Sequence, residues 1–402
     1  MNGTTNKALR NFAIFTALAT LYLICIGGLV TSHGVGMSVP DWPTTYGYNM
    51  FRYPISGWIA GVYYEHTHRL VASVLGLLTT ILALWLWCRE TTGKARWGGV
   101  TAIVIILGIA GGMMGIRTTP VFVAIAVAGG CGILLGLYQY AQTRASGARW
   151  LGIAALSAVI LQGVLGGLRV KLSMDSIGVF HAMLAQLFFL LVAAIALLQT
   201  NRWNDLPRHA VSDSKNFRAL FVGTTALIVL QLGIAATMRH QHAGLAIPDF
   251  PLAYGKLWPA TDAGSIELYN AHRNELLGEN AITAVQINLQ MIHRIVALMI
   301  LLAVAFCAGT TRKHLGWKHP LTKVASLWLG FIVLQVFLGA ATIWTLKAAD
   351  VATAHVAIGA LSLVTGGLLS IVSYRILAPR NQNSLARDAG STFSSNPVAS
   401  SR

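Results

Sequence analysis

Long apolar runs divide this sequence at close intervals. Ten of them reach the length of about 20 residues that an α-helix needs to cross a lipid bilayer. They cover residues 12–32, 66–88, 98–116, 119–141, 150–170, 177–199, 217–238, 289–309, 321–343 and 352–377. Because a backbone inside a bilayer must satisfy its own hydrogen bonds, these runs predict an all-α polytopic membrane protein with about ten transmembrane helices.

The charged residues predict how the chain is oriented. Of the 402 residues, 55% are hydrophobic and only 10% are charged, with a net charge of +16. Every second loop is basic, beginning with Lys7 and Arg10, and such loops face the cytoplasm. This distribution argues against a nucleic-acid partner. It predicts a multi-pass protein of the cell membrane with both termini in the cytoplasm, and the polar tail 379–402 is expected to be disordered.

Four segments of the sequence occur twice in the same order. The first pair shares the pattern P-D-aromatic-P-x-x-Y-G, in "GGLVTSHGVGMSVPDWPTTYG" and "GIAATMRHQHAGLAIPDFPLAYG". The other pairs are "EHTHRLVA" with "QMIHRIVA", "LQGVLGGLRV" with "LQVFLGAATI", and "GVFHAMLAQL" with "ATAHVAIGAL". The repeat predicts two homologous halves, residues 1–200 and 201–378, each built on a four-helix bundle.

The spacing of the repeated histidines indicates an insertion in the first half. His68 and His181 are 113 positions apart, whereas His293 and His355 are only 62 apart. The excess suits one helical hairpin of two spans, which we place at about 98–141.

Each half therefore contributes two histidines, His68 with His181 and His293 with His355. His68 and His293 open their apolar runs, and all four should lie near the outer ends of their spans. Ionisable residues inside membrane spans are costly and are usually functional. Two histidines facing each other in an apolar bundle suit axial ligation of a haem iron, whereas zinc would need further ligands. The pattern predicts one haem per half, towards the outer face.

One carboxylate distinguishes the two halves. Glu65 lies three residues before His68, on the same helix face, and Gln290 holds the matching position. This asymmetry predicts that the first half carries out the chemistry and that the second holds a haem for electron transfer or structure. Alternatively, Glu65 is only a helix-end charge favoured by the macrodipole.

Three arginines lie near the predicted haems. Arg69 and Arg294 follow two of the histidines, and Arg169 ends the fifth span, where its counterpart is Thr342. They either bind haem propionates through charge-assisted hydrogen bonds or extend to lipid headgroups.

The remaining histidines and the cysteines suggest no further site. His66 points to another helix face than His68, and its counterpart is Met291. We expect solvated or structural roles for the histidines in or near outer loops, which are His33, His240, His242 and His272. The cysteines lie inside apolar runs, so no disulfide is expected among Cys25, Cys88, Cys131 and Cys307.

Two other classes of protein share some of these features. A b-type cytochrome subunit that transfers electrons from quinol would also hold two haems between histidine pairs, but it needs haems at different depths. A transporter would often have inverted repeats with broken helices near the midplane. Here the repeat is parallel, because corresponding histidines share one face.

At these residues the chain resembles the haem A synthase family. The resemblance rests on "GVGMSVPDWP", on Glu65-x-x-His68-Arg69, on "LQGVLGGLRV" with His181, on "HRIVAL" with His293, and on His355, over roughly 12–377. It implies oxidation of the C8 methyl group of haem O to the formyl group of haem A, which terminal oxidases use. It also implies that His68 and His181 bind the substrate haem, that His293 and His355 bind a haem b cofactor, and that Glu65 is catalytic.

The sequence departs from the family pattern in two ways. Residues 33–64 contain no cysteine pair, so the chain resembles the cysteine-free branch. Family members usually have eight spans, so the hairpin is an addition whose role stays open. The expected partners are haem O, the lipid bilayer, haem O synthase or assembly factors of terminal oxidases, and a second copy of the chain.

Overall fold

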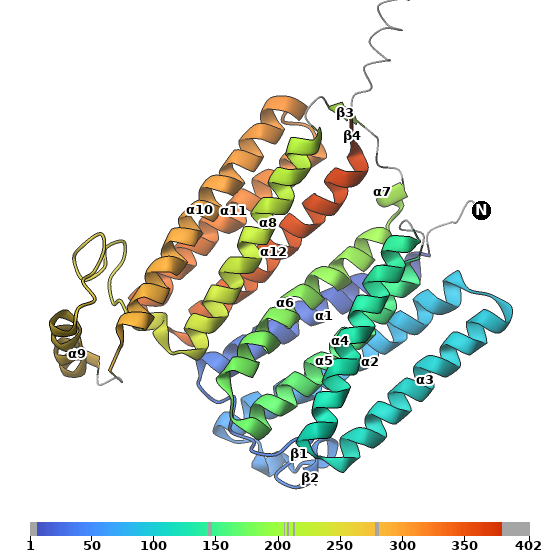
Figure 1. Ribbon diagram of the computed structural model, residues 1–402, viewed down its shortest axis with the longest axis horizontal. Helices are drawn as coiled ribbons and strands as arrows, with labels where there is room; N and C mark the ends of the chain where they lie inside the picture. The colour runs from blue at the N-terminus through green and yellow to red at the C-terminus, as the bar shows by residue number, and fades with distance from the viewer. Residues whose placement is uncertain are drawn as a thin grey trace, which may run out of the picture.

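The computed structural model describes residues 6–143, 147–204, 206, 209–211, 214–277 and 281–379 (Figure 1). Ten helices in this part are long and apolar enough to cross a membrane. The predicted all-α polytopic architecture with ten spans is therefore confirmed. The predicted disordered tail lies outside the described residues, except for Pro379.

Four helices of the first half form one bundle, called here the first bundle. They are α1 (Lys7–Ser32), α2 (Ala60–Glu90), α5 (Ala148–Leu172) and α6 (Asp175–Leu198). Their buried apolar faces meet in a common core that includes Leu9, Leu82, Leu86, Phe188 and Ile195.

The second bundle repeats this arrangement with the second half of the chain. Its helices are α8 (Ser214–His240), α10 (Ala284–Leu315), α11 (Pro320–Trp344) and α12 (Ala349–Ile376). Its core surrounds the fully buried Trp328, with Phe221, Ile300, Val304 and Leu369. The two bundles lie side by side in Figure 1, as the repeat suggests.

The bundles are joined along α1, α6, α8 and α12. Helix α1 packs on α12, and α6 packs on both α8 and α12. Ala360 and Val364 of α12 are part of the core of the first bundle. Residues of the second half therefore reach the interior of the first.

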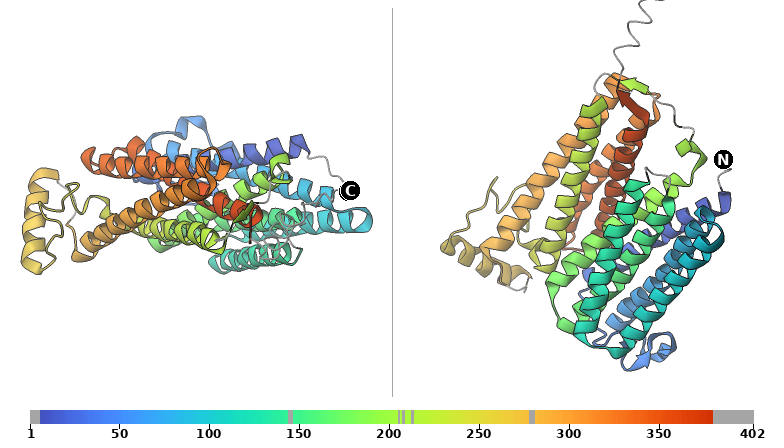
Figure 2. Two further views of the ribbon diagram at one scale, coloured as in Figure 1. Left: turned by 90° about the horizontal axis from the view of Figure 1, so that it is seen from above. Right: turned by 45° about the vertical axis from the view of Figure 1, so that its right-hand side comes forward.

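The inserted hairpin consists of α3 (Gly93–Ile116) and α4 (Thr119–Gln142). Helix α4 packs along α5, and α3 lies outside it at the edge of the molecule, away from the second bundle (Figure 2). The hairpin therefore lies at the periphery of the first bundle.

Shorter elements lie at the two ends of the bundles. One end, called here the loop end, carries strands β1 (Thr44–Thr45) and β2 (Tyr48–Asn49), the 3-10 turns η1 (Met50–Arg52), η2 (Ile55–Gly57) and η3 (Ala243–Leu245), and helix α9 (Ala263–Leu277). The opposite end carries α7 (Asn201–Asn204) and the parallel strands β3 (His209–Val211) and β4 (Leu377–Pro379).

The four repeated histidines lie at similar depths from the loop end. Helices α2 and α10 begin before their apolar runs do, so His68 lies eight residues after Ala60 and His293 nine residues after Ala284. These histidines are thus about two turns inside their helices rather than at the first turn. His181 and His355 each lie six residues after the first residue of their helices.

Candidate haem sites

Each half carries a loop built around its P-D-aromatic-P motif, and an aspartate shapes it. In the first half, the carboxylate of Asp41 accepts hydrogen bonds from Tyr46 N (2.7 Å) and Gly47 N (2.9 Å). Tyr46 is held in the left-handed backbone region, with φ of 48°, and its hydroxyl donates to Ser38 O. Burial alone would raise the pKa of Asp41, but hydrogen bonds from Thr44 and from the loop amides outweigh it and lower the pKa below 3.8.

The second loop repeats this geometry almost bond for bond. Asp249 accepts from Tyr254 N (2.7 Å) and Gly255 N (2.9 Å), and Tyr254 has a φ of 52°. The Tyr254 hydroxyl donates to Ala246 O at 2.6 Å, and its ring stacks on Tyr269 with centroids 3.7 Å apart. Burial raises the pKa of Tyr254 to about 12. The duplicated motif therefore encodes a duplicated loop.

Glu65 and Arg69 fasten the first loop to α2. Glu65 is only 4% exposed, and its Oε2 accepts from Val39 N at 2.9 Å. Its Oε1 pairs with Arg69 Nη2 at 2.6 Å. Arg69 also donates to the backbone oxygens of Val39, Asp41 and Thr44 at 2.9, 2.6 and 3.0 Å. Its terminal nitrogens are thus engaged by the loop.

Gln290 makes the corresponding anchor in the second half. Its Oε1 accepts from Ile247 N at 2.7 Å, and its Nε2 donates to Gly244 O at 3.3 Å. Arg294 donates to Asp249 O at 2.7 Å, as Arg69 does to Asp41 O. An amide therefore reproduces the backbone anchor, and the charge on Glu65 is a separate feature of the first half.

His68 and His181 face one cavity from α2 and α6. Their imidazoles are close enough to interact electrostatically. His181 Nδ1 lies 3.2 Å from Gln162 O, so a proton on Nδ1 leaves Nε2 as an electron-pair donor. A Cβ on Gly166 of α5 would lie 3.3 Å from the His181 ring, and glycine at this position gives the imidazole its room.

His293 and His355 form the matching pair from α10 and α12. These two imidazoles also interact electrostatically. The Gln231 side chain donates to His293 O at 2.9 Å and supports the helix at the histidine. Gly339 is the repeat counterpart of Gly166, and a Cβ added to it would likewise lie 3.3 Å from the His355 ring. The structure thus brings together both predicted histidine pairs.

The cavity of the first bundle has a volume of about 420 Å³, within the usual range of roughly 300–1,000 Å³ for ligand sites. Glu65, His68, Arg69, Arg169 and His181 all line it. Most of its remaining wall is apolar, with residues such as Leu75, Val159 and Phe188. Five of the residues predicted for the site therefore share one chamber.

Two residues that were not predicted to belong to the site also line this cavity. Arg239 and His240, at the end of α8, enter it from the second bundle. His240 was expected to have a solvated or structural role, but its side chain is only 10% exposed and its Nδ1 lies 3.6 Å from Asp175. The sequence feature that could have indicated this position is the basic pair in "TMRHQH", at the end of a span.

His66, by contrast, belongs to the loop. It is completely buried, and its Nδ1 lies 3.1 Å from Thr45 Oγ1. Its ring lies between Trp58 and Tyr53, with centroid distances of 4.7 and 5.2 Å. It therefore points away from His68, as their spacing predicts.

The inserted hairpin supports the cavity from the side. Met114 of α3 lines it, and Phe122 of α4 is fully buried against Trp42 with ring centroids 5.1 Å apart. Trp42 is itself a cavity residue of the first loop. The hairpin thus braces the cavity of the first bundle.

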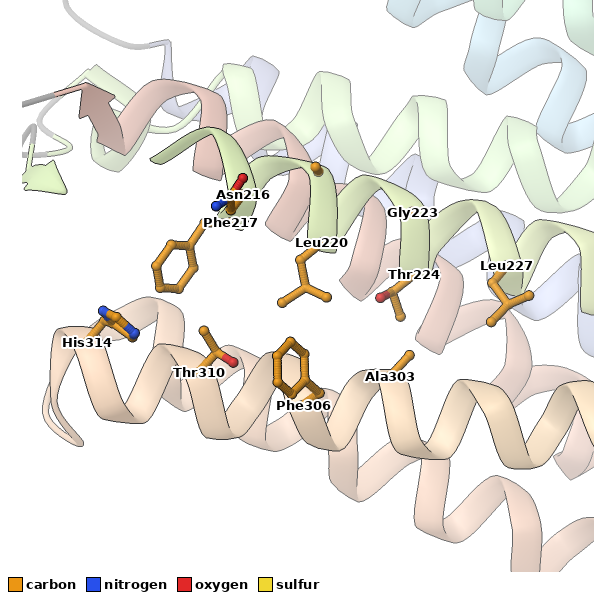
Figure 3. Close-up of a pocket in the computed structure, with 11 residues that line it drawn as sticks. Asn216, Phe217, Leu220, Gly223, Thr224, Leu227, Ala303, Phe306, Thr310 and His314 are labelled. Carbon is orange, nitrogen blue, oxygen red and sulfur yellow. The ribbon is translucent and has the colours of Figure 1, made fainter. Parts of the chain in front are cut away.

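A second cavity, of about 540 Å³, lies between α8 and α10 at the end opposite the loops (Figure 3). Phe217, Leu220, Phe306 and His314 are among its lining residues. The four predicted haem ligands are not part of it.

The residues around the two histidine pairs fit haem. Nδ1 of His68 and His293 is buried without a hydrogen-bond partner in the described part of the chain. In the same residues, His, Cys, Asp and Glu nowhere gather in groups of three or more that could hold a metal ion alone. A haem iron needs only two axial ligands from the protein, because the porphyrin supplies the other four.

Comparison with known proteins agrees with this reading. A family model described as "Cytochrome oxidase assembly protein" matches residues 117–366. A protein of Alkalihalophilus pseudofirmus named "Heme A synthase" is 23% identical over 374 residues, which cover 92% of this chain and 96% of that protein. Proteins with the same name from Rhizorhabdus wittichii and Shouchella clausii are 22% and 24% identical, over 89% and 67% of this chain and 91% and 71% of their own lengths. The chain therefore belongs to the cytochrome oxidase assembly protein family, as one of its haem A synthases.

Proposed function

We propose that this protein oxidises the C8 methyl group of haem O to the formyl group of haem A, and that the first bundle holds the substrate. The observation that carries the proposal is the shared cavity of His68, His181 and Glu65. Two imidazoles there face each other in an apolar chamber, with a carboxylate on the same wall. The names of the relatives support the same activity.

In this proposal His68 and His181 hold the iron of haem O, and His293 and His355 hold haem b as a resident cofactor. When bound, haem supplies the redox chemistry that amino-acid side chains lack. Gln162 orients His181 through Nδ1, which leaves Nε2 for the iron. Gly166 and Gly339 provide matching space beside the imidazoles in the two halves.

Glu65 is the proposed catalytic group of the chain. It lies three positions before His68, on the cavity wall, and its two oxygens are fixed by Val39 N and Arg69. A carboxylate held in this way stabilises positive charge that develops near it, or accepts a proton at Oε1 or Oε2. Because the carboxylate is already oriented, little reorganisation is needed during the reaction.

The two halves then have different roles, in line with the division at residue 200. The first half binds and oxidises the substrate, and the second holds haem b for electron transfer or structure. We place both haems towards the outer face of the cell membrane and both termini in the cytoplasm, on the basis of the basic loops. The propionate contact proposed from the sequence is kept for Arg169 and Arg294, whose buried Nε atoms have no partner in the described residues, whereas the loop and Glu65 engage both terminal nitrogens of Arg69.

The experiment that tests this function is pigment analysis. Cells that make haem O but not haem A would express the protein, and the extracted haems would be identified by mass. We expect haem A to appear only when the protein is present. Haem O alone, with the protein stably inserted and binding haem, would contradict the proposed activity.

A further inference from the structure

We propose that Arg169, Arg239 and His240 form a carboxylate site across the junction of the two bundles, and that it takes the propionates of the haem held by His68 and His181. The inference deepens the proposed function by giving the second half a direct part in substrate binding. It rests on that function only for the identity of the ligand.

Arg239 brings an unmatched positive charge into the cavity. Both of its hydrogen bonds use Nη2, which donates to Gly28 O (2.7 Å) and Ser32 Oγ (2.6 Å) of α1. These acceptors are neutral, and no carboxylate of the described residues lies within ion-pair distance of this guanidinium. Its Nη1 and Nε thus remain for an anionic ligand from outside the chain.

Arg169 presents a second cation from α5. Its Nη1 donates to Gly36 O at 3.3 Å, and its Nη2 lies 3.8 Å from the carboxylate of Asp175. Its Nε is buried without a partner in the part of the chain that the structure describes. The guanidinium side chain is only 19% exposed, so this unpaired N–H group is costly unless a ligand accepts from it.

His240 completes the group. Its ring also contacts Asp175, at 3.6 Å, and lies close to the backbone of Gly178 on α6. Asp175 is the one carboxylate facing this cluster in the described residues, and its side chain is 64% exposed. One exposed carboxylate therefore faces two arginines and a histidine, so the site has an excess of positive charge.

The repeat shows that this cluster is confined to the first bundle. Arg169 has Thr342 as its counterpart in the second half. Helix α1, the counterpart of α8, ends at Ser32, and His33 beyond it stacks on Tyr64 with centroids 4.6 Å apart. The basic groups of this cluster are therefore specific to the first bundle and do not follow from the duplication of the fold.

The chemistry of the cavity selects its ligand. A haem is an apolar disc with two carboxylates on one edge, and it needs an apolar chamber with cations at one end. The wall here is apolar along α1, α2 and α5, and the three basic groups gather where α5, α6 and α8 meet. Guanidinium groups bind carboxylates through directed, charge-assisted hydrogen bonds.

The test compares two porphyrins of one size, iron protoporphyrin IX and its dimethyl ester, which cannot carry the propionate charges. Full-length protein in detergent is titrated with each, in a His355→Ala background that weakens the second haem site. The proposal predicts that the parent binds the free acid at least tenfold more tightly, about 1.4 kcal/mol. Arg239→Gln and Arg169→Gln should each reduce this preference to about threefold or less, mainly by weakening free-acid binding.

The ratio within each variant separates recognition from folding, because a loosened bundle would weaken both ligands alike. Arg239→Lys should restore part of the preference. Lys171→Gln is the matched control, since Lys171 is a cation at the same end that does not line the cavity. A preference unchanged within about twofold in both arginine variants, or absent from the parent, would overturn the proposal. If the preference behaves as expected but no haem A forms in cells, the proposed function fails and the carboxylate site stands.

Discussion

The carboxylate of Glu65 and the guanidinium of Arg69 form a buried ion pair, with 2.6 Å between Oε1 and Nη2. Both groups also hold the backbone of the first loop, Glu65 through Val39 N and Arg69 through three carbonyl oxygens. One pair therefore closes the loop over the cavity and fixes the orientation of the proposed catalytic carboxylate.

Comparison with the second half separates these two tasks. Gln290 anchors Ile247 N as Glu65 anchors Val39 N, but it carries no charge. A glutamine is thus sufficient for the loop. If Glu65 were only a helix-end charge, neither its hydrogen bond to Val39 N nor its salt bridge with Arg69 would be explained.

The first prediction concerns Arg69→Gln. Removing one partner of a buried ion pair leaves the other uncompensated, which costs about 3–5 kcal/mol in soluble proteins. We expect a clear fall in thermal stability and faster proteolysis of residues 33–59. Arg294→Gln is the control, because Arg294 bonds its loop without an acidic partner on its own helix. Equal effects of the two substitutions would contradict the special role of the pair.

The second prediction concerns the cofactor site. His293→Ala or His355→Ala should lower the low-spin haem spectrum of the purified protein, because each removes one proposed iron ligand. His272→Ala, at an exposed position of α9, should leave the spectrum unchanged. An unaltered spectrum and haem content in both ligand variants would remove this assignment.

The third prediction is a pH dependence of the first loop. Hydrogen bonds from Thr44 and the loop amides hold the pKa of Asp41 below its ordinary value, so they stabilise the fold above the ordinary pKa and are lost as the pH falls through the lowered pKa. We expect pepsin to cut residues 33–59 increasingly between about pH 5 and about pH 2. In Asp41→Asn the loop should be looser at the upper end of this range and should change less with pH. A parallel pH response of the two proteins would exclude Asp41 as the responsible group.

The fourth prediction concerns the hairpin. Phe122 is fully buried and contacts Trp42, so Phe122→Ala should open the cavity wall and weaken haem binding in the first bundle. Large-to-small changes at such positions cost about 3–5 kcal/mol in soluble cores. Ile105→Ala, at a position 53% exposed on α3, is the control. Haem titration and melting temperature measure both variants, and equal behaviour would mean that the hairpin does not support the site.

Much of this arrangement could be predicted because the signals are local. Apolar runs define the ten spans, and the repeated letters around His68 and His293 define the two bundles. The anchoring of Glu65 to Val39 could not be predicted, since it joins positions 26 residues apart through a loop without regular periodicity.

The role of α8 could not be predicted for a similar reason. Arg239 reaches Gly28, which is 211 residues away and in the other half of the chain. The repeat indicates that the halves are alike, but it contains no information on which faces meet. His240 was therefore classed with the loop histidines, and only the packing of α8 on α6 reveals its place on the cavity wall.

The most direct test of the account is the conversion of haem O by Glu65→Gln. The second half shows that glutamine makes the loop anchor, so this change removes the charge and keeps the hydrogen bond to Val39 N. It also leaves Arg69 without its carboxylate partner, but three loop carbonyls still accept from this guanidinium, so we expect some loss of thermal stability with haem still bound. Haem A formation is therefore compared per bound haem with the parent and with Glu267→Gln, a control at an exposed carboxylate on α9. We predict that haem A formation falls by more than tenfold, or over about 1.4 kcal/mol in the activation free energy. Formation within a few-fold of the parent, with haem bound normally, would contradict a catalytic role for the carboxylate.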